Sequence, residues 1–401
     1  MGYKPCGCDS QSLFRCCLPV WTILQVIPEL SAGGAERTTI EIAEAVHARG
    51  GRALVASEGG RLEKELSEAG GELIRLPLST KNPFEMRKNA DRLAELALAR
   101  RVDLIHARSR APAWSAYWAS KRLRLPFVTT YHGIYNARTP WKNWYNSVMA
   151  RGDAVIANSQ YTADHLIRRH RVDPARVTVI LRGVDLQKFD IDAVSDTRAA
   201  AVHEGWGLAD SDNRPIILHA ARLTRWKGLK LAIEAAAKLK SIGAPPFVLV
   251  LVGDSQGRDA YVAELADLIR ERDLTGSVLM PGHCADMPAA FKAATAVIQP
   301  SLEPEAFGRS AAEAQAMGAP VIAAAHGGLP EVIADGVSGF LVPPGDSEAL
   351  AGALNRLLTM TKNDRAAMGL AGMQRARRLF AKETLQEATL SVYAKLIGER
   401  A

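Results

Sequence analysis

The chain has 401 residues, of which 48% are hydrophobic and 23% are charged, proportions typical of soluble globular proteins. Its length exceeds what a single core of about 250–300 residues accommodates, so we expect two domains. No apolar run approaches the ~20 residues that a membrane-spanning helix requires, which leaves a soluble or a peripheral protein.

The positive charge of the chain lies in its first half. The net charge is +7, yet residues 1–185 carry 27 Lys and Arg against 18 Asp and Glu, and the remainder carries 23 against 25. A basic half predicts an acidic partner, such as an anionic membrane surface or a phosphorylated glycan. Nucleic acid is disfavoured, because no recognised nucleic-acid-binding module accompanies the charge.

Four cysteines crowd residues 1–20, which we expect to be a poorly ordered leader. Cys6, Cys8, Cys16 and Cys17 fit no common zinc spacing, and Cys284 makes the count odd, so no disulfide framework is expected. The pattern favours a reduced, cytoplasmic protein, with peripheral attachment to the inner face of a membrane as an open extension. Reversible acylation of the leader is an alternative role for these cysteines.

Short apolar runs alternate with helical patterns along nearly the whole chain. In the first half we expect strands at 22–27, 52–56, 72–76, 103–106, 126–131, 153–157 and 177–180. In the second half we expect strands at 215–220, 247–252, 277–280, 295–299 and 319–323. Helix-like segments fall between them, at 35–49, 85–101, 111–124, 228–241, 258–271 and 309–317. This β-α-β rhythm predicts an α/β fold of two Rossmann-like, doubly wound domains built on mostly parallel sheets.

The weakest periodicity divides the chain. We place the N-terminal domain at 21–190, a linker at 191–214, where Asp, Gly, Asn and Pro accumulate, and the C-terminal domain at 215–379. A last amphipathic helix at 380–401 can cross back onto the first domain. Open parallel sheets bind ligands outside the carboxyl ends of their strands, so two such domains would face each other across a cleft.

Two loops of the first domain are candidates for that cleft. Gly33 and Gly34 follow strand 22–27 and permit close approach of backbone to a ligand, although three spaced glycines of a dinucleotide fingerprint are absent. His132 follows strand 126–131, where a neutral imidazole can donate to or accept from a sugar hydroxyl. A plain turn and a structural histidine are the alternatives.

Two cations follow strand 215–220 of the second domain. Arg222 ends the strand and Lys227 precedes the next helix, so they can grip a diphosphate from two directions, one as a fork and one as a point charge. Arg225 lies between them and could compete for the role. Solvated surface cations are the alternative reading.

Two glutamates stand eight positions apart in the segment 303–313. If Glu305 lies on the loop before a helix and Glu313 about two turns inside it, both can face one cavity, with the N–H groups of residues 307–310 between them. Such a cavity suits a sugar phosphate. A solvent-facing pair of helical glutamates is the alternative.

Taken together, these motifs resemble the family-4 (group 1) retaining glycosyltransferases of GT-B fold. The resemblance covers about residues 21–395 and is carried by Glu305-x7-Glu313 and by Arg222-x4-Lys227-Gly. Further matches are the segments 182–185 (Arg-Gly-Val-Asp) and 327–331 (Gly-Gly-Leu-Pro-Glu). Arg182 stands where the family shows Asn, and the turn from Gly253 also departs from the family pattern.

The resemblance implies a hexosyl transfer from a nucleotide diphosphate sugar with retention of configuration. It implies that no metal and no other cofactor is needed, because cations and helix N-terminal amides neutralise the leaving diphosphate. The implied catalytic residues are Glu305, His132, Arg222 and Lys227. The implied substrate-binding residues are Gly33, Gly34, Phe307, Gly308, Glu313 (to the ribose), Gly253, Gly327 and Gly328.

The acceptor is less defined. The amino-acid sequence of segments such as 303–308 resembles that of bacterial enzymes of lipopolysaccharide or other surface-glycan synthesis. This resemblance implies a glycan or glycolipid acceptor. Helix 111–124 interleaves Trp114 and Trp118 with basic residues, and an interfacial surface and a core helix are both open. A nucleotide-sugar epimerase and a catalytically silent nucleotide-sugar binder are the rival functions.

Metal-binding acids are not expected. Asp190-Ile-Asp192 and Asp210-Ser-Asp212 match the Asp-x-Asp pattern of metal-dependent glycosyltransferases, but both lie in the expected linker, where no strand would position a metal. No cluster of His and Cys has the spacing of metal ligands. We therefore interpret these acids as solvated loop residues.

Overall fold

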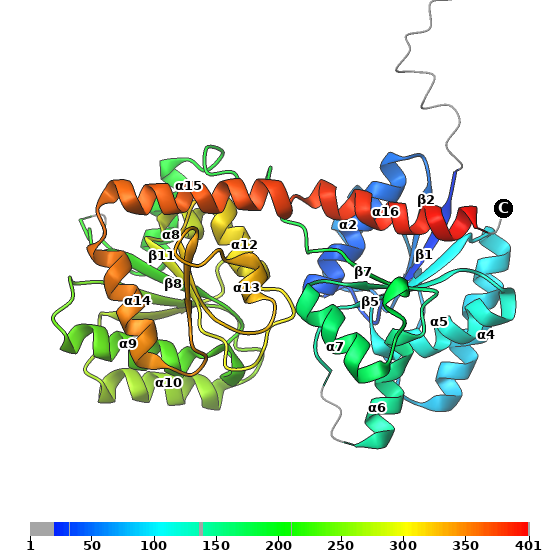
Figure 1. Cartoon of the computed structure of the whole chain (residues 1–401), viewed down its shortest axis with the longest axis horizontal. Helices are drawn as coiled ribbons and strands as arrows, with labels where there is room; N and C mark the ends of the chain where they lie inside the picture. The colour runs from blue at the N-terminus through cyan, green and yellow to red at the C-terminus, as the bar shows by residue number, and fades with distance from the viewer. Residues whose placement is uncertain (1–19, 32, 136–138, 210, 400–401) are drawn as a thin grey trace, which may run out of the picture.

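The computed structural model describes residues 20–31, 33–135, 139–209 and 211–399. Two α/β units lie side by side, each with a parallel sheet between helices, and α15 (Lys362–Leu379) and α16 (Lys382–Gly398) run along one side of both (Figure 1). The two doubly wound α/β domains expected from the sequence are confirmed. The cysteines of the expected leader lie outside the described residues.

The first sheet has seven parallel strands in the order β3-β2-β1-β4-β5-β6-β7, each within one residue of the bounds expected from the sequence. The strands are β1 (Thr22–Val26), β2 (Arg52–Ser57), β3 (Gly71–Arg75), β4 (Leu104–Ala107), β5 (Phe127–Tyr131), β6 (Ala154–Ala157) and β7 (Val177–Val179). The helices of this unit are α2 (Gly34–Ala48), α3 (Glu63–Glu68), α4 (Pro83–Arg100), α5 (Arg110–Leu123), α6 (Pro140–Asn146) and α7 (Gln160–His170), with 3-10 turns η1 (Ser147–Ala150) and η2 (Pro174–Arg176).

The second sheet has six parallel strands in the order β10-β9-β8-β11-β12-β13. They are β8 (Ile216–Ala220), β9 (Val248–Val252), β10 (Val278–Gly282), β11 (Ala296–Gln299), β12 (Val321–Ala324) and β13 (Gly339–Val342). The helices around it are α8 (Asp196–Gly205), α9 (Leu229–Ser241), α10 (Asp259–Glu271), α11 (Met287–Ala293), α12 (Arg309–Ala316), α13 (Leu329–Val332) and α14 (Ser347–Thr359), with the 3-10 turn η3 (Arg225–Lys227). Strand β13 was not expected from the sequence.

Both sheets are buried on two faces, which explains their continuous apolar strands. Every residue of β1 is buried, with Ile23 in one hydrophobic cluster and its neighbour Leu24 in the cluster on the opposite face. Successive side chains of a strand point to opposite faces, so each face needs its own helical cover. Helices α2 and α16 contribute to one cluster, and α4 and α5 to the other.

The strand order places the two switch points of the fold at β1 and β8. Strand β1 lies between β2 and β4, and β8 lies between β9 and β11. The strands that directly follow β1 or β8 in the sequence lie on one side of it, and the later strands lie on its other side. Crevices form at the carboxyl ends of such strands. The Gly33-Gly34 loop follows β1 and the Arg222-to-Lys227 segment follows β8, so both expected loops lie at switch points.

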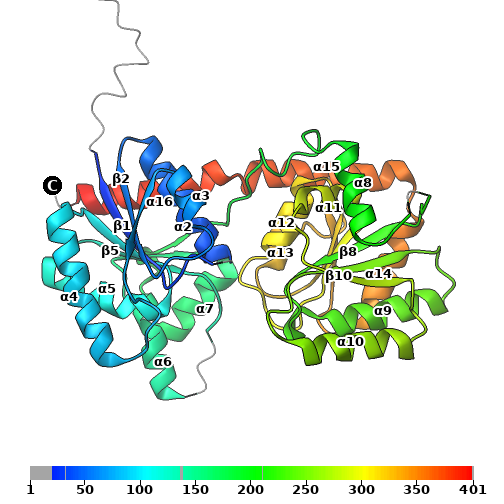
Figure 2. The same cartoon turned by 180° about the vertical axis from the view of Figure 1, so that it is seen from behind.

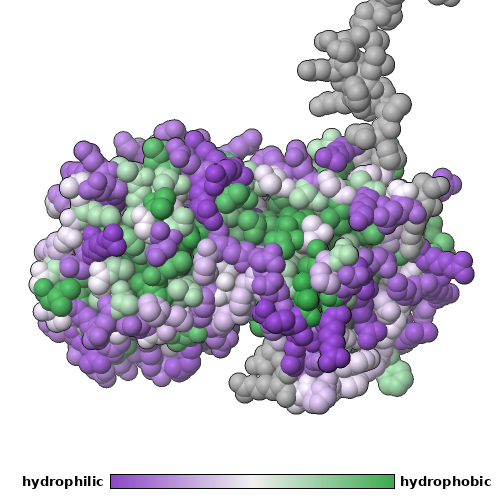
Figure 3. All heavy atoms as spheres, viewed as in Figure 1, coloured by the Kyte–Doolittle hydropathy of each residue, from purple (hydrophilic) through white to green (hydrophobic). Residues whose placement is uncertain are grey.

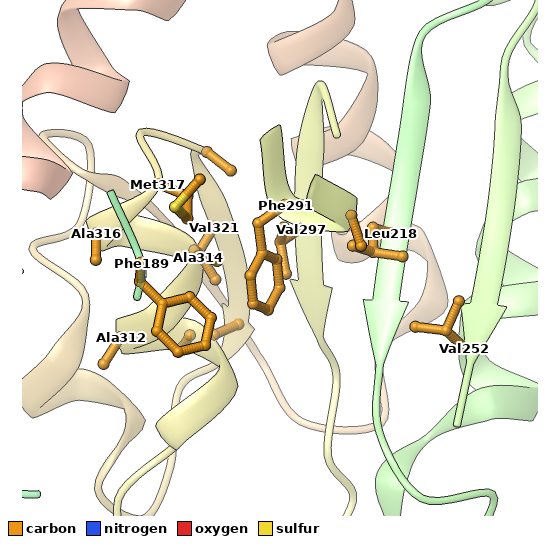
Figure 4. Close-up of a cluster of buried hydrophobic side chains, with 14 of the residues drawn as sticks. Phe189, Leu218, Val252, Phe291, Val297, Ala312, Ala314, Ala316, Met317 and Val321 are labelled. Atoms are coloured by element: carbon orange, nitrogen blue, oxygen red, sulfur yellow. The ribbon is translucent and has the colours of Figure 1, made fainter. Parts of the chain in front are cut away.

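The segment expected as a linker is packed structure. Residues 191–214 include α8, and Val194, Trp206 and Leu208 are buried in the same cluster as the second sheet. Just before this segment, the Phe189 ring lies 6.2 Å from that of Phe291, and Figure 4 shows it between Phe291 and Ala312. The packing of this segment could not be predicted from the sequence. Its apolar residues are sparse, and each contacts the core singly rather than as part of a periodic helical face.

The final helix crosses back onto the first domain, as expected. Gln386 of α16 donates to the backbone oxygen of Glu41 in α2 at 2.7 Å, and Lys382 lies 3.0 Å from the Glu44 carboxylate. Tyr393, which is fully buried, bonds to His106 of β4. Figure 1 shows α15 over the second unit and α16 over the first, so this helix pair ties both units together.

The open question about helix 111–124 is resolved for one of its tryptophans. Trp114 of α5 is 3% exposed and belongs to the first domain's core, whereas Trp118 is half-buried and packs against that core. Within the described ranges, none of the helices combines the length and apolar character needed to cross a bilayer.

Candidate active site

A cavity of about 630 Å³ lies between the two domains. The first domain lines it with Gly33, Gly34 and Glu41, and the second with Arg309 and Glu313 of α12. Figure 2 shows α2 and α12 facing each other, and Lys382 at the start of α16 also lines the cavity. Figure 3 shows a separate notch between the two lobes, on the side away from α15 and α16. The loop after β1 and the second-domain helix therefore meet in one cleft.

Glu313 is bound by a residue one helical turn earlier. Its Oε1 accepts from Arg309 Nε at 2.9 Å, and Arg309 Nη2 donates to Oε1 of Glu41 on α2 at 2.8 Å. Burial raises the pKa of Glu313, while Arg309 opposes the shift. Arg309 thus bridges the domains and holds the carboxylate that the resemblance assigns to the ribose.

Glu305 lies in a dense polar cluster at the exits of β8 and β11. Its Oε1 accepts from Lys227 Nζ at 2.6 Å, from Gln299 Nε2 at 2.7 Å and from the Ser301 hydroxyl. Burial acts to raise the pKa of Glu305, but the Lys227 ammonium and the hydrogen bonds outweigh it and hold the pKa below its usual value. Glu305 is therefore a carboxylate at neutral pH, and its Oε2 has no donor among the described residues.

Only one of the two glutamates lines the interdomain cavity. Glu313 lines the interdomain cavity, whereas Glu305 is 9% exposed and is not among the described residues that line it. Gly308, with φ of 105°, lies between them as the N-cap of α12. What the structure does bring together is Glu305 with Lys227, which are 78 residues apart in the sequence.

The remaining second-domain residues support the segment around Glu305. Gly327 has φ of 67°, and a Cβ there would lie 2.4 Å from the Glu305 backbone oxygen, while the Gly328 N–H donates to that oxygen at 2.7 Å. Phe307 is buried against Phe380, with ring centroids 5.5 Å apart. No acceptor among the described residues pairs with the N–H groups of Phe307 and Gly308, so these amides are available to a ligand.

Two further residues flank this site. Gly253 follows β9 and packs so closely on Ala221 that a Cβ would lie 1.8 Å from its backbone oxygen. Arg222 is exposed, and among the described residues none forms an ion pair or a hydrogen bond with its guanidinium. The competing Arg225 pairs with Glu264 instead, at 2.7 Å. Arg222 is therefore the free cation of this turn and Lys227 the engaged one.

His132 is held as a neutral imidazole. Its Nδ1 lies 3.1 Å from Arg182 Nη2, and because a guanidinium can only donate, Nδ1 accepts and Nε2 carries the proton. Burial, aided by Arg182 and Arg108, holds the pKa of His132 well below its usual value. The Nε2 atom is buried without a partner among the described residues, so it is a donor awaiting an acceptor.

Three guanidinium groups converge behind the Gly33-Gly34 loop. Arg108, Arg182 and Arg309 each keep one buried terminal nitrogen, Nη2 or Nη1, without a hydrogen-bond partner among the described residues. Burial lowers the pKa of Arg182 to about 10, with Arg309 and Arg108 adding to the effect and Glu41 opposing it. A Cβ on Gly34 would lie 2.3 Å from Arg182 Nη1, so this glycine lets the backbone lie against the guanidinium. The cluster therefore holds three spare N–H donors among the described residues, together with one buried acceptor, Glu41 Oε2, that also lacks a partner there.

A second link between the domains lies at α7. The Glu331 carboxylate accepts from the N–H groups of Gln160 at 2.7 Å and Tyr161 at 2.8 Å. These are the first two residues of α7, whose N-terminus favours an anion because its amides lack helical partners. Glu331, which follows Gly327 and Gly328 in the sequence, therefore joins this segment of the second domain to the first domain.

The acidic pairs 190/192 and 210/212 show no metal arrangement. Asp190 accepts from the Asp192 backbone N–H, and Asp212 pairs with Arg214 at 2.7 Å, while Asp210 lies outside the described residues. In the part of the chain that the structure describes, no three His, Cys, Asp or Glu side chains are grouped closely enough to hold a metal ion. Independence from metal stays a prediction of the resemblance.

The sequence reasoning missed Glu41, Arg108 and Arg309 and gave Arg182 no role. Two of these left a signal: Arg182 replaces an Asn in a recognised turn, and Arg309 stands between the two predicted glutamates. Glu41 and Arg108 gave none, because a charged residue in a helix or after a strand is usually solvated. Only their burial, at 4% and 2% exposure, identifies them.

Comparisons with known proteins agree with this geometry. The family described as "Glycosyltransferase Family 4" matches residues 32–188, and "Glycosyl transferases group 1" matches residues 206–375. A D-inositol 3-phosphate glycosyltransferase of Xylanimonas cellulosilytica is 33% identical over 74% of this chain and 73% of its own length. Another from Salinispora tropica is also 33% identical, with 74% of this chain and 64% of its own length covered.

Solved structures are similar over nearly the whole chain. A glycosyltransferase from Rickettsia africae is 34% identical with a TM-score of 0.87, covering 95% of this chain and 99% of that one. HepE from Anabaena, solved in complex with UDP and glucose, is 27% identical with a TM-score of 0.81 over 94% of this chain and 100% of that one. This chain therefore belongs to the family-4, group 1 glycosyltransferases, and its two facing α/β domains have their GT-B fold.

Proposed function

We propose that the enzyme transfers a hexosyl group from a nucleotide diphosphate sugar to a glycan or glycolipid acceptor, with retention of configuration and without a metal ion. The observation that carries the proposal is the set of spare donors in the cleft, where Arg182 and Arg309 keep buried N–H groups without acceptors among the described residues. A diphosphate supplies the anionic oxygens that such groups prefer. Arg222, with no partner among the described residues, would reach it from the second domain.

The transfer step would proceed with assistance from four residues of the cleft. The acceptor hydroxyl oxygen attacks the anomeric carbon, the bond from that carbon to the diphosphate oxygen breaks, and the hydroxyl proton passes to the departing phosphate. Lys227 and Arg222 would stabilise the charge that develops on the diphosphate. His132 Nε2–H would donate to the hexose, and Glu305 Oε2 would accept from a sugar hydroxyl. Closure of the domains would exclude water and so limit hydrolysis of the donor.

Lipopolysaccharide or other surface-glycan synthesis is the setting that we propose, from the resemblance of the sequence. The relatives named D-inositol 3-phosphate glycosyltransferases favour a second candidate, in which the acceptor is a small phosphorylated polyol. In both cases the donor would lie in the same cleft, and the acceptor would bind to the first domain.

Calorimetry in the presence of a chelator tests the donor site. UDP-, GDP- and ADP-glucose are titrated into wild type, Glu313→Ala and, as a matched control on an exposed helix, Glu348→Ala. We expect one nucleotide sugar to bind, with the Glu313 variant at least about tenfold weaker, as loss of a charged hydrogen bond predicts, and the control unchanged. Folded wild-type protein that binds none of the three would overturn the proposal.

An acceptor-free incubation separates the rival functions. The bound donor is followed by NMR without any acceptor, and the sugar should keep its identity. Conversion of the sugar into its epimer would instead identify an epimerase. A panel of glycan, glycolipid and polyol acceptors is then added. A donor that binds but is not consumed with any of these acceptors would favour a silent binding protein.

A further inference from the structure

A second cavity lies entirely within the first domain. It has a volume of about 590 Å³ and lies at the carboxyl ends of β1, β4 and β5, beside Pro28, Ser109 and Tyr135. This is the same edge of the sheet that faces the donor cleft. Tyr135 connects the two places, because it lines this cavity and lies three residues after His132, which contacts Arg182 of the cleft at 3.1 Å.

The cavity is positively charged. Lys81, Arg110 and Lys142 line it, and no carboxylate stands among its described lining residues. Arg110 donates to Asn146 Oδ1 at 3.0 Å and stacks 4.1 Å over the Tyr135 ring, so its position is fixed. The ammonium groups of Lys81 and Lys142 have no ion-pair partner in the described part of the chain. We call Lys81, Arg110, Lys142 and Asn146 the cationic pocket.

An unpartnered buried donor lies in this pocket. Asn146 is 1% exposed, and its Nδ2 has no hydrogen-bond partner among the described residues. Because Oδ1 accepts from Arg110, the amide cannot turn over to relieve the nitrogen. The neighbouring Tyr145 hydroxyl is buried without a partner as well. A ligand with several acceptor oxygens would satisfy these groups, and the start of α5 at Arg110 adds the positive end of a 14-residue helix.

An apolar groove adjoins the cationic pocket. It has a volume of about 430 Å³ and shares Lys81, Lys142 and Tyr145 with that pocket. Its other lining residues include the side chains Pro83, Met86, Trp114, Trp118, Trp141 and Trp144, which we call the tryptophan groove.

The groove presents its aromatic rings to solvent. The Trp141 and Trp144 rings stack at 4.8 Å, and Trp144 stacks on the buried Trp114 at 4.5 Å. Trp141 is 71% exposed and Trp144 44% exposed, an unusual state for side chains of this size. Exposed tryptophans beside lysines are typical of surfaces that meet the boundary between headgroups and acyl chains.

We propose that the acceptor is an anionic amphiphile, a lipid with a phosphate-bearing headgroup, whose phosphate binds in the cationic pocket while its hydrocarbon chain lies in the tryptophan groove. This inference rests on the proposed transferase function and adds the chemical class of its acceptor. Charge complementarity selects the headgroup, and the shared wall of the two cavities selects a single molecule that spans both. The hydroxyl to be glycosylated is then held next to Tyr135, which joins this pocket to the loop that carries His132.

Calorimetry with three probes tests the proposal on the full chain. The probes are farnesyl phosphate below its critical micelle concentration, farnesol and inorganic phosphate. We expect farnesyl phosphate to bind at least tenfold more tightly than either of the others. Arg110→Gln should weaken it at least tenfold, whereas Lys64→Gln, an exposed cation on α3, should leave it unchanged.

A second pair of variants tests the groove separately. Trp141→Ala combined with Trp144→Ala should weaken farnesyl phosphate severalfold and leave inorganic phosphate unchanged, while Leu98→Ala, an exposed apolar residue on α4, should change neither. Equal affinity for farnesyl phosphate and inorganic phosphate, with no effect of the tryptophans, would assign the pocket to a soluble phosphorylated acceptor and overturn the lipid. No binding of any probe would overturn the pocket itself.

Donor binding in the same variants separates this inference from the proposed function. Nucleotide-sugar affinity that persists in wild type and in Arg110→Gln, with no binding of the phosphate probes, would count against the acceptor site alone. Loss of donor binding in folded wild type would count against the transferase function instead. A thermal unfolding curve of each variant confirms that the first domain remains folded.

Discussion

The two halves of the cleft handle their buried charge in opposite ways. After β8, in the second domain, Lys227 and Glu305 neutralise each other, and Ser301 and Gln299 donate to the same carboxylate oxygen, Oε1. After β1, in the first domain, Arg108 and Arg182 are buried with donors to spare. A satisfied pair supports the fold before any ligand arrives, whereas unsatisfied cations lower stability and gain from a bound anion. Substitutions in the second-domain half are therefore expected to lower both stability and activity. Substitutions in the first-domain half are expected to lower mainly activity.

The largest effect is expected at the satisfied pair. Glu305→Ala leaves the Lys227 ammonium, whose side chain is only 12% exposed, without its counter-charge. We expect the free energy of unfolding to fall by about 3 kcal/mol, as for other broken buried pairs, together with loss of transfer activity. Chemical denaturation measures the change. The exposed pair of Lys238 and Glu348 supplies the control, because Lys238→Ala should cost less than about 1 kcal/mol.

In the first-domain half of the cleft, a substitution should reduce activity while leaving stability nearly unchanged. Arg182→Met removes a buried guanidinium but keeps a side chain of similar length, so we expect a stability within about 0.5 kcal/mol of wild type or higher. Activity should fall by about 100-fold, as for the loss of one donor to developing negative charge. Denaturation and steady-state kinetics on one preparation give both numbers. A loss of stability as large as that of Glu305→Ala would remove the distinction between the two halves.

The smallest expected effect is on the pH dependence of stability, through His219 beside the pair of Lys227 and Glu305. Burial lowers the pKa of His219 to about 3, and neither ring nitrogen has a partner among the described residues. The unfolded chain therefore takes up a proton below about pH 6.5 that the folded chain refuses, so stability falls as pH drops from about 6.5 toward 3. His219→Leu should reduce the loss between pH 7.5 and pH 5.5 by about 1 kcal/mol, measured by denaturation at both values. An unchanged loss would show that the imidazole titrates freely in the folded protein.

The segment that follows β7 shows where sequence reasoning failed. Twelve of the thirteen strands in the described part of the chain were predictable, because buried strands need apolar runs that stand out between helices. Residues 191–214 were misread as a linker, because Val194, Trp206 and Leu208 reach the core singly from a polar background. A residue's burial depends on what covers it, and the cover here comes from the second sheet's own helices.

The sequence by itself determined the fold class, the family and the position of the loops at the two switch points. These follow from local features: apolar periodicity, glycines in turns, and cations and acids at fixed spacing after strands. Only the tertiary structure paired Lys227 with Glu305, set Arg309 between Glu41 and Glu313, and gathered the unsatisfied guanidinium groups behind Gly34. Partnership between distant charges depends on distances and burial, which the chain acquires only when its two sheets fold and face each other.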